Sequence, residues 1–117
     1  MVAASTGPVV TVFRSRLRPD AAARGYQQLA SDMESLARSM PGFVDFKSFS
    51  APDGERVSVI TFDSIAHQHA WRLHPEHVAA QQRGREDFYD EYEIAVCMRV
   101  RHHRWRLPRA GLGNRSS

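Results

Sequence analysis

Residues 20–42, DAAARGYQQLASDMESLARSMPG, carry the clearest secondary-structure signal in the chain. Their apolar side chains recur at alternating spacings of four and three residues, which is the period of one helix face. Pro19 and Asp20 suit a first helical turn, because proline gives up an amide that this turn leaves unbonded and an acid favours the positive end of the helix dipole. Met-Pro-Gly at residues 40–42 is typical of a helix end. The stretch therefore predicts an amphipathic helix whose stripe is Ala22, Tyr26, Leu29, Met33, Leu36 and Met40.

Four strands and a second, interrupted helix are predicted around this helix. The β-branched and aromatic residues of 9–17 favour a strand, and residues 43–50 and 56–62 flank a Pro-Asp-Gly turn as the two arms of a hairpin. Apolar residues alternate along residues 92–100, which predicts the last strand. Between them a helix is expected in two pieces, over about 64–73 and 75–90, since Pro75 disfavours helical geometry at His74.

This order of elements, βαββαβ, predicts an α+β fold of the ferredoxin-like kind, a four-stranded antiparallel sheet with its helices on one face. The strands carry large apolar side chains at both alternating positions. An uncovered apolar sheet face of this size usually marks an interface, and a two-fold pair is the commonest oligomer. We therefore expect a homodimer, on the strength of Val9, Phe13 and Phe49 at one parity and Val10, Val12 and Phe46 at the other.

Charge gives no indication of nucleic-acid binding. The chain of 117 residues carries a net charge of +3, but four arginines fall in its last fourteen residues. Without them the net charge of residues 1–103 is −1. The basic character therefore belongs to the C-terminal end, and we expect no nucleic-acid partner. The division expected is a mobile segment at 1–7, one domain at 8–103 and a basic tail at 104–117.

Hydropathy and cysteine content narrow the class of protein further. No apolar run approaches the roughly 20 residues that span a bilayer, and the first residues lack the basic and apolar regions of a signal peptide. A cytoplasmic protein without a membrane partner is the resulting expectation. Cys97 is the only cysteine, which excludes an internal disulfide and a cysteine-based zinc cluster. On a strand, such a residue is expected to be a small buried group.

Several motifs together resemble the antibiotic biosynthesis monooxygenase (ABM) family. They are GERVSVITF at 54–62, AWRLHPEH at 70–77, QRGREDFYDEY at 82–92 and MPGF at 40–43. The resemblance covers roughly residues 8–103. It implies a ferredoxin-like protomer in a dimeric α/β barrel. Members include cofactor-independent monooxygenases of aromatic polyketides, quinol monooxygenases, haem-degrading enzymes and proteins without an established activity, so the fold transfers better than the reaction.

Trp71 is the first candidate for a functional residue. The resemblance places it where the family's monooxygenases and haem degraders carry a tryptophan near the substrate. An indole can stack on a flat substrate and donate one hydrogen bond. The alternative, which the sequence leaves open, is a core tryptophan that anchors the helix to the sheet.

Three histidines, His67, His74 and His77, surround Trp71 in the sequence. An imidazole can accept a proton near neutral pH, and deprotonation of a phenol or hydroquinone would prepare it for reaction with O₂. The plainer alternative for each is an exposed helix histidine, with His74-Pro-Glu-His77 serving as a helix start. No HExxH spacing is present and no metal site is expected.

Four further residues are candidates for substrate binding. Tyr26 and Tyr89 carry phenol hydroxyls, Phe13 an apolar ring, and Arg72 a cation that could bind a carboxylate. Packing between helix and sheet is the commoner role for Tyr89, and surface ion pairing is the commoner role for Arg72.

Haem degradation is disfavoured by two departures from the family pattern. The resemblance implies an asparagine on the first strand, and residues 9–17 contain none. The position aligned with the haem-ligating histidine is about Gln81, unless His77 takes that role. The function predicted is therefore a cofactor-independent monooxygenase of an aromatic or quinol-like small molecule, with O₂ as co-substrate. The alternative is a non-enzymatic dimer that binds a small ligand or is associated with stress.

Overall fold

In the computed structural model, the residues described are 7–108, so the predicted mobile start and most of the predicted basic tail lie outside them. Regular structure begins where β-branched residues accumulate in the sequence. The elements in chain order are β1 (Val9–Leu17), α1 (Tyr26–Ser39), β2 (Phe43–Ser50), β3 (Arg56–Phe62), α2 (Ile65–Arg72), α3 (Pro75–Arg83), a π-helical turn (Gly84–Phe88) and β4 (Tyr89–Met98).

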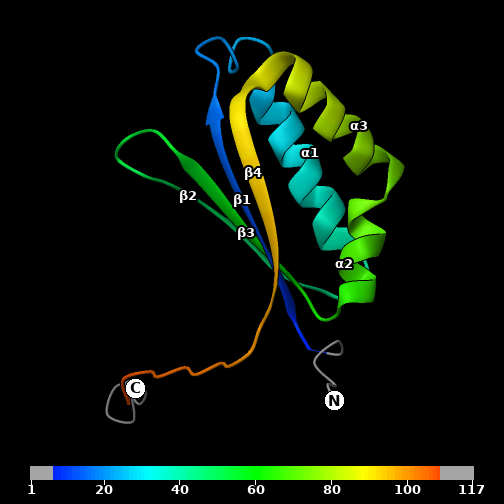
Figure 1. Cartoon of the computed structure of the whole chain (residues 1–117), viewed down its shortest axis with the longest axis vertical. Helices are drawn as coiled ribbons and strands as arrows, with labels where there is room; N and C mark the ends of the chain where they lie inside the picture. The colour runs from blue at the N-terminus through cyan, green and yellow to red at the C-terminus, as the bar shows by residue number, and fades with distance from the viewer. Residues whose placement is uncertain (1–6, 109–117) are drawn as a thin grey trace, which may run out of the picture.

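The four strands form one antiparallel sheet in the order β2-β3-β1-β4. The hairpin of β2 and β3 is local, whereas β1 lies between β3 and β4, two strands that are distant from it in sequence. All three helices lie on one side of the sheet and leave the other face open (Figure 1). This is the predicted ferredoxin-like α+β fold.

The first helix begins later than predicted, at Tyr26 rather than near Asp20. Residues 19–25 form turns instead, and Gly25 closes them in a left-handed conformation with φ 97° that glycine adopts without a steric penalty. In this arrangement Ala21 is buried against Tyr26 and Phe88, while Ala22 is exposed. Tertiary packing of Ala21 therefore overrides the local helix signal.

The predicted break in the second helix is confirmed. Ser64 caps α2 by accepting a hydrogen bond from the His67 amide at 3.2 Å, and Pro75 occupies the first turn of α3. The chain between the two helices is extended at His74.

The second helix piece ends earlier than the predicted residue 90, because α3 stops at Arg83, and β4 starts at Tyr89 rather than at residue 92. A π-helical turn joins them, and Arg18 satisfies its carbonyl groups. The guanidinium of Arg18 donates to the carbonyl oxygens of Glu86 at 2.7 Å and Arg85 at 2.9 Å. These long-range bonds hold a turn that sequence periodicity does not signal.

Two apolar clusters pack between helices and sheet. One contains Ala37, Ile60, Phe62 and Trp71, and the other contains Ala21, Tyr26 and Phe88. Phe46, rather than Phe49, lies on the helix side, as its contact with the first cluster shows. The clusters position α1 and α2 over the sheet and form two walls of the site described below.

The uncovered sheet face is apolar at its centre and charged at one end. Register and alternation place Val12, Val59 and Ala95 side by side on it, and Phe49 is 52% exposed. Cys97 is exposed there, so the prediction of a buried cysteine is wrong. At the charged end, arginines on β1 pair with acids on the hairpin turn and β4: Arg14 with Glu55 and Glu93, and Arg16 with Asp53 and Glu91.

After β4 the chain leaves the domain as an exposed segment, residues 99–108, without regular structure (Figure 1). Trp105 is 71% exposed within it, so its ring packs little against the rest of the domain. Over residues 7–108, no helix has the length and apolar character needed to cross a membrane.

Candidate functional site

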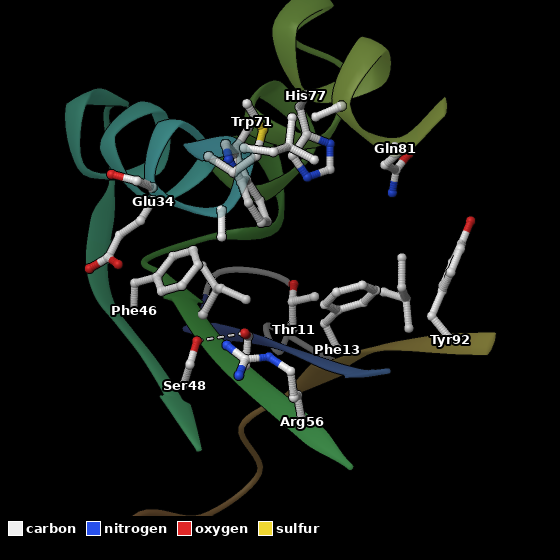
Figure 2. Close-up of a pocket in the computed structure, with 18 of the residues that line it drawn as sticks. Thr11, Phe13, Glu34, Phe46, Ser48, Arg56, Trp71, His77, Gln81 and Tyr92 are labelled. Carbon is white, nitrogen blue, oxygen red and sulfur yellow. Dashed lines mark hydrogen bonds between the residues drawn. The ribbon is translucent and has the colours of Figure 1, made fainter. Parts of the chain in front are cut away.

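A cavity of about 350 Å³ lies between the helices and the sheet. Its floor is formed by alternate residues of the strands and its roof by α1, α2 and α3. Figure 2 shows Thr11, Phe13 and Arg56 rising from the sheet, with Trp71 and His77 facing them from the helices. The volume suits a small ligand of about two or three fused rings, at the lower end of the usual range for such pockets.

Trp71 and His77 form a tilted pair of rings in contact in the roof. Trp71 is 4% exposed and its ring centroid lies 4.4 Å from that of His77, with the planes inclined at 60°. Trp71 also contacts Phe62, at 5.4 Å between centroids. Trp71 therefore fills both roles that the sequence left open, because it is a core residue and also lines the cavity.

The protonation of His77 follows from its surroundings. Burial lowers the pKa of this imidazole below its usual value, and the nearby positive charge of Arg72 acts in the same direction. Hydrogen bonding to the backbone of Arg72 opposes these effects without reversing them. His77 is therefore neutral at neutral pH and has one ring nitrogen available as a proton acceptor.

Aromatic rings line the opposite end of the cavity. Phe13 meets Tyr89 and Tyr92 at centroid distances of 5.5 Å each, and Tyr26 lies 6.0 Å from Tyr89. Burial, followed by the neighbouring Tyr26, raises the pKa of Tyr89 far above its usual value. Tyr89 thus stays a neutral hydroxyl, and the four rings offer flat apolar surfaces to a planar ligand.

Four buried polar atoms of described residues lack a hydrogen-bond partner, and all four belong to side chains that line this cavity. Leaving such atoms unbonded costs about 1–3 kcal/mol each, so their concentration at one place indicates a site for a polar ligand or water. They are Arg56 Nε, Gln68 Oε1, Trp71 Nε1 and His77 Nδ1.

Sequence reasoning missed Arg56 and Gln68. Arg56 lies on the same face of its strand as Ser58 and Ile60, the face that points into the domain. A charged residue at such a position is the sequence signal that could have identified Arg56. Gln68 is 2% exposed and donates to Thr11 Oγ1 at 3.4 Å. It lies on α2, three residues before Trp71, a spacing that shares a helix face.

The other two histidine candidates do not line the cavity. His67 Nδ1 lies 2.6 Å from Asp63 Oδ1, and this contact lowers the pKa of the Asp63 carboxyl. His74 caps α3, since its Nδ1 accepts a hydrogen bond from the Glu76 amide at 3.1 Å. Of the substrate-binding candidates, all four line the cavity: Phe13, Tyr26, Arg72 and Tyr89.

Comparison with known proteins agrees with this geometry. Residues 8–83 match the family described as antibiotic biosynthesis monooxygenase. The chain belongs to this family. The chain is also similar to YqjZ of Bacillus subtilis (strain 168), with 39% identity over 73 residues, which are 62% of this chain and 64% of YqjZ. The match therefore spans less than two thirds of that relative.

Solved structures share the fold at low identity. Rv0793 from Mycobacterium tuberculosis superimposes with a TM-score of 0.72 at 21% identity, over 82% of this chain and 98% of its own. SnoaB from Streptomyces nogalater, described as a cofactor-independent oxygenase, was solved as a mutant and gives a TM-score of 0.69 at 13% identity, over 81% and 95%. These likenesses establish the arrangement of the ABM fold.

The family's haem-degrading pattern is not reproduced around this cavity. Gln81 lines the cavity, and β1 contributes Thr11 and Phe13 rather than an asparagine. Among residues 7–108, no group of three or more histidine, cysteine or acidic side chains is arranged to hold a metal ion. Among the described residues that line the cavity, His77 is the single histidine.

Proposed function

We propose that this ABM protein is an oxygenase of an aromatic or quinol-like small molecule, with O₂ as co-substrate and no bound cofactor. The observation that carries the proposal is the Trp71–His77 pair, a buried indole in tilted contact with a neutral imidazole at the wall of an apolar cavity. The description of SnoaB as a cofactor-independent oxygenase on the same fold supports it by analogy.

The chemistry follows from the atoms that face the cavity. A phenolic hydroxyl gives its proton to a ring nitrogen of His77, and the resulting electron-rich anion reacts with O₂. For an anthrone, a new C–O bond forms at the activated carbon, and loss of water leaves the quinone, so one O₂ yields one quinone and one water. Trp71 orients the ring and donates from Nε1 to a substrate oxygen, while Gln68 Oε1 accepts from a hydroxyl.

The test is oxygen uptake with anthrones, quinols and catechols. We expect Trp71→Phe and His77→Gln to reduce the rate at least tenfold, because the first removes an N–H donor and the second a base. Trp105→Phe and His69→Gln are matched controls at exposed positions and should keep the wild-type rate. Uptake that is unchanged in both cavity variants would refute the assignment of roles.

The alternative function is ligand binding without turnover. Binding and oxygen-uptake measurements with the same aromatic compounds separate this function from an oxygenase. A binding protein takes up the compounds in the cavity without consuming O₂ above the no-protein rate. An open cavity next to Trp71, rather than a filled core, favours a protein that receives a ligand in either case.

We also propose that two copies pair through the uncovered sheet face. Val12, Val59 and Phe49 make its centre largely apolar, with Lys47 beside Val59, and no helix of the described chain covers it (Figure 1). Pairing would remove this surface from water at about 25 cal/mol per Å² of apolar area. The cavity lies on the opposite, helix side, so each subunit keeps its own site.

A further inference from the structure

Arg56 brings an uncompensated cation to the cavity floor. It is the first residue of β3 and pairs with Ser15 on β1 and Ser50 on β2. Both neighbours are small, so the guanidinium can extend across the floor, and its Cζ lies 5.6 Å from the centroid of the Tyr26 ring. Contact with an aromatic face orients a guanidinium without neutralising its charge.

No acid of the described chain neutralises this cation. Arg56 takes part in none of the ion pairs within residues 7–108, and its Nε is buried without a hydrogen-bond partner. Glu55, the preceding residue, points to the opposite sheet face, where it accepts from Arg14 at 3.0 Å. Glu34 lines the cavity but pairs with Arg38 at 2.8 Å.

A cation without a partner in a partly closed apolar site attracts an anion more strongly than the same charge in water. The guanidinium presents N–H groups in a planar fork that matches a carboxylate. Tyr26 lies beside the guanidinium, and Tyr89 and Phe13 continue the same wall of rings in the cavity. The site thus combines one anion-binding group with a surface for a flat aromatic body.

We propose that the ligand of this cavity is an aromatic acid, whose carboxylate binds Arg56 while its ring system lies between the sheet and the Trp71–His77 pair. The inference rests on the proposed function for the location of the ligand and adds the charge that the ligand carries. It concerns binding, so it stands or falls independently of whether O₂ is consumed.

The test compares 6-hydroxy-2-naphthoate with its methyl ester, which keeps the ring and hydroxyl but lacks the charge. Titration calorimetry at pH 7 is carried out on the wild-type protein and on Arg56→Met, Arg56→Lys and Arg101→Met. Arg101 is exposed beyond β4 and outside the cavity, so its replacement removes a charge without touching the site.

We expect the wild-type protein and Arg101→Met to bind the acid at least tenfold more tightly than the ester. Arg56→Met should lose this preference to within about twofold, and Arg56→Lys should keep part of it, because an ammonium retains the charge but not the fork. Circular dichroism and thermal melts establish that each variant is folded. If Arg56→Met does not fold, Arg56→Lys tests the proposal: its ratio of acid affinity to ester affinity should be lower than that of the wild-type protein.

Equal wild-type affinity for acid and ester, failure to bind the acid, or a preference that survives in Arg56→Met would each overturn the proposal. A charge preference without any oxygen uptake would leave it standing and refute the oxygenase function. Oxygen uptake with neutral quinols but no preference for the acid would support the oxygenase function and refute the proposal of an acidic ligand.

Discussion

Trp71 and His77 pack against each other in a tilted arrangement with their ring centroids 4.4 Å apart, although they are six positions apart in the sequence. On an uninterrupted helix, residues six apart lie about 240° apart around the axis and face different directions. The extended backbone at His74, between α2 and α3, turns the second piece so that both rings meet at the cavity. The break in the helix therefore creates the pair that the proposed chemistry needs.

Trp71 should carry a large share of the stability of the domain. Trp71→Ala removes a ring that contacts Phe62 and His77, and we expect a loss of about 3–5 kcal/mol in the free energy of unfolding. Trp71→Phe keeps an aromatic ring and should lose less than half of this. Denaturant titration measures both, and the exposed Trp105→Ala should change stability by less than about 0.5 kcal/mol. A Trp71→Ala loss no larger than that of Trp105→Ala would contradict the packing described here.

His77 should make stability depend on pH in a defined direction. Its pKa is lowered in the folded protein, so the unfolded chain takes up a proton near the ordinary value of 6.5 while the folded chain does not. Below that pH the unfolded state binds more protons, and the free energy of unfolding falls as pH decreases, down to the folded pKa. Above pH 6.5 this contribution is constant.

Subtraction isolates this effect from the titration of other groups. The difference in unfolding free energy between wild type and His77→Gln should be flat from pH 8 to 7 and decrease below about 6.5, with a slope of at most about 1.4 kcal/mol per pH unit. A slope of the opposite sign would mean that the folded protein favours the charged imidazole.

Two glycines with similar backbone conformations should differ in their tolerance of a side chain. Gly42 has φ 81° and Gly54 has φ 94°, so alanine is strained by about 1–2 kcal/mol at either. A Cβ at position 42 would also collide with the His67 ring and lie 2.5 Å from Asp63 Oδ1, whereas nothing lies within 4 Å at position 54. Gly42→Ala should therefore lower the melting temperature more than Gly54→Ala, and equal shifts would disprove the close contact.

The proposed dimer can be tested at the centre of the open sheet face. Val59→Glu places a charge between Val12 and Lys47, the residues that flank it in the sheet, and should convert the dimer to a monomer in light scattering at micromolar concentration. Val78→Glu, a comparable change on the exposed surface of α3, should leave the dimer intact. Wild-type protein that is monomeric at high concentration would remove the basis for this proposal.

The element order, the helix break at Pro75 and most of the strands were predictable, because periodicity, proline and glycine act within a few residues. The start of α1 was not, since Ala21 is drawn out of the helix by contacts with Phe88, which is distant in sequence. The extent of β4 was missed for a similar reason. Its π-helical lead-in is held by Arg18, and no local pattern at residues 84–88 records that partner.

For the site, the helix pattern and the family motifs were enough to select Trp71, His77 and the tyrosines as candidates. Which histidine faces the cavity, and that Arg56 and Gln68 join it, became known from the packing of the elements. Local periodicity fixes the face of a helix or strand, whereas the partner of a buried polar atom depends on how separate elements pack. His67 and His74 found partners within four residues, and the four unpartnered atoms converged only when sheet and helices closed over one space.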